Sequence, residues 1–263
     1  MYRRASLALA LAFGFVVSAG MAWAQPSKGN SNSCSTLPSH SALKAALDSA
    51  VAAETSGLDF QMWATMVDRD GVVCAVAFSG VDRGAQWPGS RAISAQKANT
   101  ANAFSLDGLA LSTANLFSAV QPGGSLFGLQ ESNPVDVSVA YKGPSAAYGQ
   151  ANDPMVGSKI GGVNVFGGGL ALYAPGGVAI GAVGVSGDTS CADHFIGWRV
   201  RDNLALDNFG TSVGGVSGDA MRPDNIIFDI APNPGGGTGI SAGGFGHPTC
   251  INTGDQTALP PVG

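Results

Sequence analysis

The chain has 263 residues, of which 45% are hydrophobic and only 12% are charged, a composition that excludes a largely disordered protein. Thirteen basic and 18 acidic residues give a formal charge of −5. This balance argues against a nucleic-acid partner, because a surface that binds nucleic acid needs a basic patch. The composition therefore indicates a folded globular protein and leaves its chemistry to the motifs.

The first 24 residues have the pattern of a secretory signal peptide. Arginines at positions 3 and 4 precede an apolar run over residues 7–17, and Ala22-Trp23-Ala24 has the A-x-A form of a cleavage site. The apolar run is too short for a spanning helix, and an N-terminal anchor is the less favoured alternative. We therefore expect a mature chain that begins at Gln25, lacks a membrane span and resides in the periplasm or outside the cell.

Four cysteines remain in the mature chain, and in an exported protein they indicate two disulfides with three possible pairings. Cys34 and Cys250 lie near the two ends of the mature chain, which fray unless they are tied down. We therefore expect the pairs Cys34–Cys250 and Cys74–Cys191. A redox or metal site is less favoured because the sequence contains no C-x-x-C.

Hydrophobic periodicity and turn residues predict the secondary structure along the chain. Helices follow apolar residues that recur every three or four positions, and strands follow extended apolar runs that end in Gly, Asn or Pro turns. In chain order we predict a helix over 41–55, strands over 60–67 and 72–78, helices over 91–105 and 109–120, a strand over 135–141, strands over 170–173 and 178–185, a helix over 191–206 and a strand over 225–230.

The stretch 160–187 contains no charged residue, yet its ten glycines and Pro175 argue against a membrane span. Both faces of the predicted strand over 178–185 are apolar, which is typical of a strand covered on both sides. A three-layer α/β/α arrangement is therefore expected. We divide the chain into a leader over 25–40, one domain over 41–206 and a Gly/Pro-rich extension over 207–263 that packs on the same domain.

Several signatures of catalysis and cofactor binding are missing from the sequence. Gly184-Val185-Ser186-Gly187 lacks the final spacing of the serine-hydrolase elbow, and no nucleophile–base pair is recognisable. The three histidines have no zinc spacing. A haem needs only one axial ligand and an apolar slot, and His194 is the best-placed candidate, ahead of His40 and His247. The alternative is that His194 hydrogen-bonds a helix end or a loop carbonyl.

A second candidate group lies on the helix predicted over 91–105. Lys97 and Thr100 are one turn apart and could hold a carboxylate, whether a haem propionate or a small acid. The alternative is a solvated lysine whose stem covers apolar surface. Arg91 could add positive charge to this site. Ser190 and Asp193 have the spacing of a capping box for the last predicted helix.

Three strings in this order resemble the GlcG/HbpS-type haem-binding protein family. They are Lys97–Ala101 (KANTA), Gly167–Gly169 before a strand, and Ile180–Gly187 (IGAVGVSG) followed by Asp193. The resemblance spans about residues 41–206 and implies a profilin-like α+β fold with a five-stranded antiparallel sheet and helices on both faces. It also implies homo-oligomers and, in some members, haem binding outside the cytoplasm. It transfers no axial ligand to a position of this chain.

These observations lead to the hypothesis of an exported protein that binds haem or another small-molecule ligand. Its pocket is expected near Lys97, Thr100, Gly167–Gly169 and His194, with Arg91 nearby. The alternative is an enzyme that acts on a small carboxylated or aromatic metabolite in the same pocket, with Lys97 as charge stabiliser and Asp193 as acid or base. A third class, a structural or interaction protein, also remains open.

Overall fold

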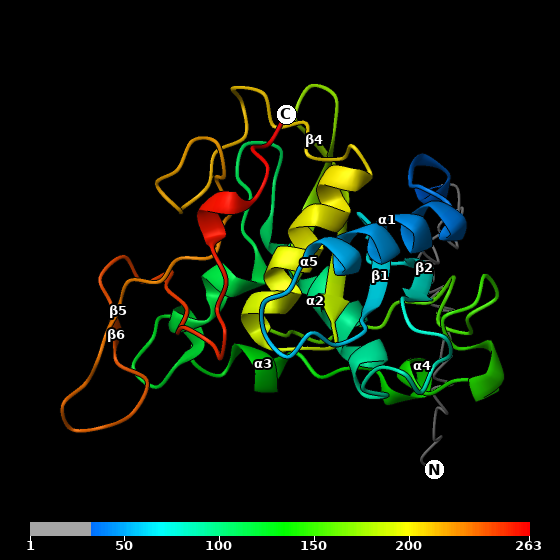
Figure 1. Cartoon of the computed structure of the whole chain (residues 1–263), viewed down its shortest axis with the longest axis horizontal. Helices are drawn as coiled ribbons and strands as arrows, with labels where there is room; N and C mark the ends of the chain where they lie inside the picture. The colour runs from blue at the N-terminus through cyan, green and yellow to red at the C-terminus, as the bar shows by residue number, and fades with distance from the viewer. Residues whose placement is uncertain (1–32) are drawn as a thin grey trace, which may run out of the picture. The chain divides into compact units, whose positions relative to one another are not determined.

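The structure is a computed structural model that describes residues 33–263, so the predicted signal peptide and the first half of the leader lie outside the described residues. None of the described helices is long and apolar enough to cross a membrane. In chain order the elements are η1 (Ser33–Thr36), α1 (His40–Ala53), β1 (Trp63–Asp68), β2 (Val73–Phe78), α2 (Ser90–Phe104), η2 (Thr113–Leu116), η3 (Ser118–Val120), α3 (Leu129–Ser132), α4 (Val137–Ala140), η4 (Ser145–Ala147), β3 (Gly169–Ala174), β4 (Val178–Ser186), α5 (Ser190–Asn203), β5 (Ile230–Ala231), β6 (Ile240–Ser241) and η5 (Gln256–Ala258) (Figure 1).

The main sheet has four antiparallel strands in the order β2-β1-β4-β3. Met66 of β1 lies opposite Val183 of β4, and β4 pairs on its other side with β3. The prediction of an α+β fold with an antiparallel sheet is confirmed, but the expectation of five strands is wrong. The remaining two short strands, β5 and β6, pair only with each other in a separate sheet.

Three predicted elements differ from the structure. Only residue 230 of the strand predicted over 225–230 lies in a strand, the short β5. In the other two, local capping overrides the hydrophobic pattern. Residues 135–141 do not form a strand, since the Asp136 carboxylate accepts the N–H groups of Ser138 and Val139 and starts the helical turn α4. The helix predicted over 109–120 is reduced to the short 3-10 turns η2 and η3, the first of which begins at a capping box between Ser112 and Asn115.

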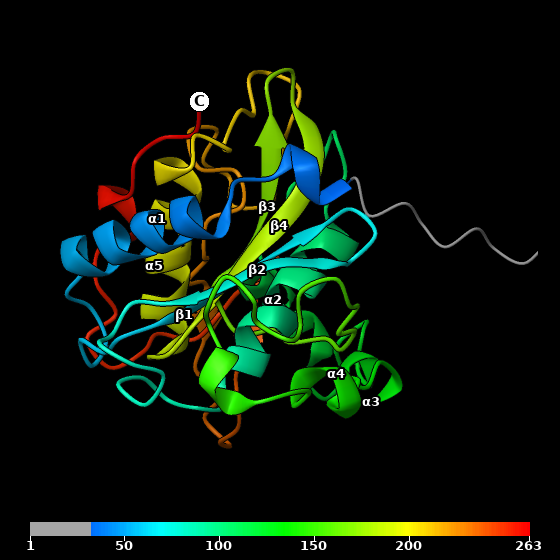
Figure 2. The ribbon, with the colours of Figure 1, turned by 90° about the vertical axis from the view of Figure 1, so that its right-hand side faces the viewer.

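Helices cover both faces of the main sheet (Figure 2). Helices α1 and α5 pack on one face through residues such as Leu43, Leu47 and Phe195, and α2 packs on the other through its alanine stripe. The alanines bring α2 close to β4, where a Cβ at Gly184 would collide with the carbonyl oxygen of Ser94. The three-layer arrangement follows from these apolar surfaces.

Irregular segments cover part of each outer edge of the main sheet. At the β2 edge, Val73 donates to Ser158 O at 2.9 Å and accepts from Gly157 N at 2.9 Å. At the β3 edge, Tyr173 donates to Leu206 O at 2.7 Å, and Asn208 N donates back to Tyr173 O at 3.3 Å. These segments supply main-chain partners without becoming additional strands of the sheet.

The cysteines pair differently from the expected pattern. Cys34 is bonded to Cys74 and Cys191 to Cys250, with Cα–Cα distances of 5.4 and 6.0 Å. The expected pairs Cys34–Cys250 and Cys74–Cys191 are wrong. The segment before α1 lies against β2, whereas the residues after α5 (204–263), which we call the C-terminal segment, reach the start of α5. Each bond therefore joins an irregular segment to the nearest element of the sandwich.

The residues after α5 return over that helix and the neighbouring turns. The Trp198 indole N–H donates to Pro260 O at 2.9 Å, and the Ser118 hydroxyl donates to Gly246 O at 2.6 Å. The Arg201 guanidinium and the Asp224 carboxylate form an ion pair with an N–O distance of 2.6 Å. These contacts attach the C-terminal segment to α5 and η3.

Candidate functional site

Lys97 of α2 and Asp193 of α5 form a buried ion pair where β4 ends between the two helices. Lys97 Nζ lies 2.5 Å from Asp193 Oδ2 and donates to Val185 O at 3.1 Å. Asp193 Oδ1 accepts the N–H groups of Gly187 and Asp188 at 3.0 and 2.9 Å. The pair therefore links the helices on the two faces of the sheet to the end of its interior strand.

Burial controls the protonation of both members of this pair. Burial raises the pKa of Asp193 to about 6, an effect that the Lys97 charge and the accepted hydrogen bonds partly offset. Burial likewise lowers the pKa of Lys97, and the Asp193 carboxylate opposes that change. Asp193 does not close a capping box with Ser190: the N-cap of α5 is Thr189, whose side chain accepts from Ala192 N at 3.3 Å.

The ion pair lies at a cleft of about 340 Å³ that we call the Lys97 cleft. Two of its aromatic side chains, Trp87 and Phe166, are 48% and 45% exposed, so they stand at the rim. Ligand pockets in proteins usually span about 300–1,000 Å³, and this cleft falls at the small end of that range. Its lining residues are Trp87, Ser90, Ile93, Lys97, Phe166, Ser186, Asp188, Ser190 and Asp193.

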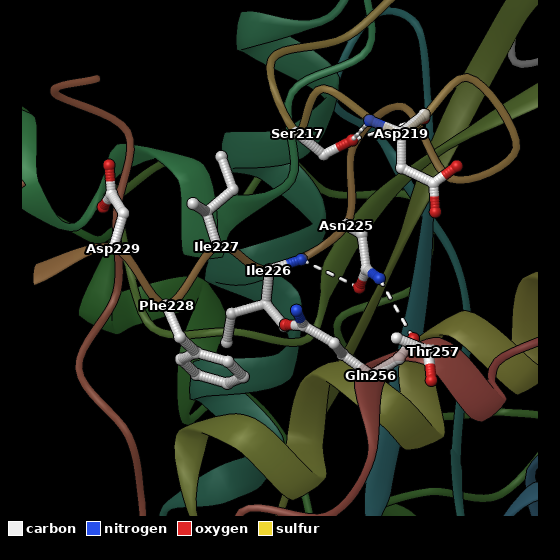
Figure 3. Close-up of a pocket in the computed structure, with 9 residues that line it drawn as sticks. All are labelled: Ser217, Asp219, Asn225, Ile226, Ile227, Phe228, Asp229, Gln256 and Thr257. Atoms are coloured by element: carbon white, nitrogen blue, oxygen red, sulfur yellow. Dashed lines mark hydrogen bonds between the residues drawn. The ribbon is translucent and has the colours of Figure 1, made fainter. Parts of the chain in front are cut away.

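His194 is not among the residues that line the Lys97 cleft. Its fully buried ring points to the C-terminal segment, where Nε2 accepts from Ile226 N at 3.2 Å and lies 3.2 Å from Asn225 Oδ1. Its Nδ1 is buried and has no hydrogen-bond partner among the described residues. Burial lowers the pKa of His194 to about 3. Asn225 lines a separate hollow of about 260 Å³, which Figure 3 shows beside Gln256 and Thr257.

Thr100 and Gly167–Gly169 have structural roles near the cleft. The Thr100 hydroxyl donates to Gln96 O at 2.8 Å and accepts from Asn164 N at 3.0 Å. A Cβ at Gly167 would collide with Ser190 O, and Gly168 and Gly169 are similarly crowded by Val185 O of β4 and Lys97 O of α2. The three glycines therefore let the start of β3 pass closely between α2 and α5.

Arg91 lies outside the lining of the Lys97 cleft. Its guanidinium forms a bidentate ion pair with Asp153, with Nε donating to Oδ2 at 2.8 Å, and Nη1 donates to Ala140 O at 2.6 Å. Its Cζ lies 3.6 Å from the centre of the Tyr148 ring. Arg91 therefore anchors the segment around residues 140–153 to α2.

Sequence patterns alone do not indicate a role for the rim residues Trp87 and Phe166. The available signals were the Trp87-Pro88-Gly89 turn directly before α2 and the aromatic residue directly before Gly167. A single aromatic residue beside a helix start or a glycine run belongs to no periodic pattern. Only the three-dimensional structure shows that Trp87 and Phe166 line the same cleft.

The fold and the cleft define a three-layer α+β domain with a ligand-sized cleft at the end of an interior strand. Residues 39–198 match the family described as haem-degrading protein HbpS-like, and the chain belongs to this HbpS-like family. No curated protein matches the chain.

Three solved structures match the chain over most of their own length. The chain is similar to protein ORFY of Klebsiella pneumoniae, at 24% identity over 64% of this chain and 90% of that one, with a TM-score of 0.43. It is also similar to PduOC in a complex with heme, at 22% identity over 62% and 89% with a TM-score of 0.43. Similarity to HbpS is 14% identity over 63% and 88%, with a TM-score of 0.37.

A haem held by a histidine–iron bond does not fit the Lys97 cleft. Its lining residues include no His, Cys, Met or Tyr, which are the usual axial ligands. The ring nitrogens of His40 and His247 contact Gly149 O at 2.9 Å and Ser190 Oγ at 2.7 Å, and His194 is fully buried against Asn225 and Ile226.

Proposed function

We propose that this protein binds a small planar ligand with an acidic oxygen in the Lys97 cleft. The observation that carries the proposal is the Lys97 ammonium beneath an aromatic rim. An ammonium has three N–H donors, and two are used by Asp193 and Val185. The third has no acceptor among the described residues, so a carboxylate or carbonyl oxygen of a ligand can accept it.

The aromatic rim favours a flat ligand over a chain-like one. Trp87 and Phe166 expose ring surface on which a planar molecule can stack, and Ile93 adds apolar surface to the same cleft. Haem belongs to this ligand class, because it combines a flat ring with carboxylates, and the family description supports it. Without an axial histidine, haem would depend on contacts with its ring and its propionates.

Calorimetric titration with three probes tests this proposal: haemin, metal-free protoporphyrin and 2-naphthoate. We expect Trp87→Ala to weaken binding about tenfold, since the variant loses one stacking surface. Phe127→Ala is the matched control, because Phe127 is a 67% exposed aromatic residue outside the cleft. Equal binding of haemin and protoporphyrin would support ring contacts, whereas equal affinity in parent and Trp87→Ala, or no binding of any probe, would overturn the proposal.

We also propose that the chain is exported and forms homo-oligomers. The two disulfides support an oxidising compartment, and the family resemblance supports oligomers. Cell fractionation and light scattering on the purified protein test the two statements separately. A reduced protein confined to the cytoplasm would contradict the first, and a strictly monomeric protein would contradict the second.

A further inference from the structure

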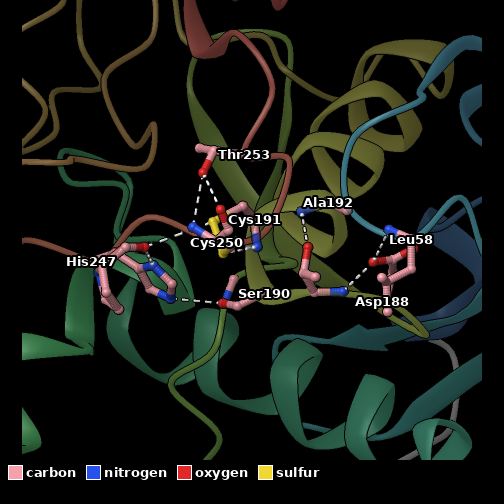
Figure 4. The surroundings of a disulfide bond; sticks show 11 residues. Leu58, Asp188, Ser190, Cys191, Ala192, His247, Cys250 and Thr253 are labelled. Carbon is pink, nitrogen blue, oxygen red and sulfur yellow. Dashed lines mark hydrogen bonds between the residues drawn. A yellow bond between two sulfur atoms is a disulfide. The ribbon is translucent and has the colours of Figure 1, made fainter.

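Ser190 and His247 lie against each other at the Lys97 cleft, although 57 positions separate them. Ser190 is the first residue of α5, is half-buried and lines the cleft. His247 comes from the C-terminal segment and is only 2% exposed. Ser190 Oγ and His247 Nε2 are 2.7 Å apart, and Figure 4 shows the two side chains pointing toward one another.

The surrounding groups determine where the protons of this pair lie. Pro248 O can only accept, so the His247 Nδ1 that lies 2.6 Å from it carries the proton. In the neutral ring Nε2 is then an acceptor. Gly167 N donates to Ser190 Oγ at 2.7 Å, which leaves the Ser190 hydroxyl hydrogen free to point at Nε2. The pair therefore has the polarity of a nucleophile beside its general base.

Three contacts fix the base in this position. The His247 backbone N–H donates to Ile227 O at 2.7 Å, and the ring lies against Phe117 with 4.9 Å between ring centroids. The Cys191–Cys250 disulfide connects the residue after Ser190 to the residue three positions after His247 (Figure 4). The disulfide therefore restrains the separation between Ser190 and His247.

The electrostatic surroundings keep His247 in its neutral form. Burial lowers the pKa of His247 to about 4, the Lys97 charge contributes in the same direction and the contact with Pro248 O opposes them, so Nε2 is unprotonated at pH 7, although the lowered pKa also makes the ring a weaker base than a free imidazole. Lys97 also lines the cleft that Ser190 lines, where its positive charge can stabilise an oxyanion.

We propose that Ser190 and His247 are a catalytic nucleophile and base that hydrolyse small uncharged aryl esters. Ser190 Oγ bonds to the ester carbonyl carbon while its proton passes to His247 Nε2. The bond to the leaving phenol then breaks, and the phenol departs with that proton. Water adds to the acyl-serine and gives a proton to Nε2, after which the acyl–Oγ bond breaks, Oγ regains the proton and the acid is released.

The cleft accounts for the class of substrate. Its volume of about 340 Å³ can hold a single ring with a short acyl group, and Trp87 and Phe166 offer surface to the ring. The Lys97–Asp193 pair has no net charge, so it does not require an opposite charge on the substrate. This inference rests on the proposed function to the extent that both place a flat ligand in the same cleft.

The test combines labelling with an aryl fluorophosphonate, mapped by peptide mass spectrometry, and hydrolysis of p-nitrophenyl acetate. We expect the label on Ser190, loss of labelling in Ser190→Ala, and a fall in kcat/KM of at least a hundredfold in His247→Gln. Ser118→Ala is the matched control, because it loses a hydroxyl tie to Gly246, next to His247, outside the cleft. It should retain both activities, as should His40→Gln.

Each outcome decides between the proposals. If the parent protein is not labelled, the catalytic pair is overturned, and this outcome does not depend on the folding of any variant. If Ser190→Ala hydrolyses the ester as fast as the parent, the catalytic pair is also overturned. Equal losses in Ser118→Ala and Ser190→Ala would show that the contact only anchors the C-terminal segment. Binding of 2-naphthoate to Ser190→Ala is measured in parallel: binding without labelling rejects the catalytic pair alone, and labelling without binding rejects only the proposed ligand.

Discussion

Arg201 and Asp224 face each other through two hydrogen bonds in a place where neither side chain has any exposed surface. Arg201 Nη1 and Nη2 donate to the two carboxylate oxygens at 2.6 and 2.9 Å. The guanidinium also lies over the rings of Trp198 and Phe209, 4.4 and 4.9 Å from their centres. This pair attaches α5 to the C-terminal segment. Because both side chains are buried, each charge is stabilised by the other in place of water.

Asp224→Asn should lower the free energy of unfolding by about 3–5 kcal/mol, because it leaves the Arg201 charge buried without a counterion. Urea unfolding measures the loss. The double variant Arg201→Met/Asp224→Leu removes both charges and should lose much less. A loss below about 1 kcal/mol in Asp224→Asn would contradict the buried geometry.

Acidification should destabilise the protein through its buried histidines. Burial lowers the pKa of His194 to about 3 and that of His247 to about 4, whereas both titrate near 6.5 when unfolded. Between pH 6.5 and 4 the unfolded state therefore binds more protons, and each histidine removes up to about 1.4 kcal/mol of stability per pH unit. Asp193 opposes this change, because its raised pKa of about 6 lets the folded state take up a proton first.

Comparing His194→Gln with the parent isolates one part of this pH dependence. The amide can still accept from Ile226 N–H but does not titrate, so the stability difference between pH 7 and pH 5 should shrink by about 2 kcal/mol. Urea unfolding at the two pH values measures it. The same pH dependence in both proteins would mean that His194 is not kept neutral by burial.

The disulfide pairing predicts two cross-linked peptides in a non-reducing digest, one joining Cys34 to Cys74 and the other joining Cys191 to Cys250. The bonds close loops of 40 and 59 positions. By the chain-entropy estimate, replacing either pair with alanines should cost about 4 kcal/mol of unfolding free energy. A peptide that joins Cys34 to Cys250 would contradict the structure.

Gly184→Ala should destabilise the protein by about 1–3 kcal/mol, because the added Cβ forces α2 away from β4. Thermal unfolding of the variant measures this loss. Gly108→Ala is the matched control, since nothing lies within 4 Å of the added atom, and it should stay within about 0.5 kcal/mol of the parent. Equal effects of the two substitutions would argue against the close helix–strand contact.

Local patterns were sufficient to predict the sandwich itself. Leu43 and Leu47 mark the buried side of α1, and the alanine stripe marks the sheet-facing side of α2. The two-sided apolar character of β4 correctly predicts that helices cover it on both faces. These signals succeed because each element buries a surface that its own periodicity defines.

The parts that the sequence did not predict depend on partners distant in the chain. Spacing alone does not show that Ser190 meets His247 or that His194 meets Ile226, since both histidine contacts involve the irregular C-terminal segment. The cysteine pairing expected from the sequence was wrong for the same reason, because Cys250 also lies in the irregular C-terminal segment. Asp136 shows a different limit, because a single capping carboxylate turned an apolar run into a helical turn.

The covered edges of the main sheet also restrict how copies of this protein can associate. Main-chain groups of Val73 and Tyr173, on the two outer strands, are already occupied by the protein's own loops. A neighbouring molecule that added a strand to the sheet at these positions would first have to displace those loops. The loops therefore protect the protein against aggregation through edge-strand pairing. At these two positions, contact between copies would therefore have to use side chains in place of main-chain pairing.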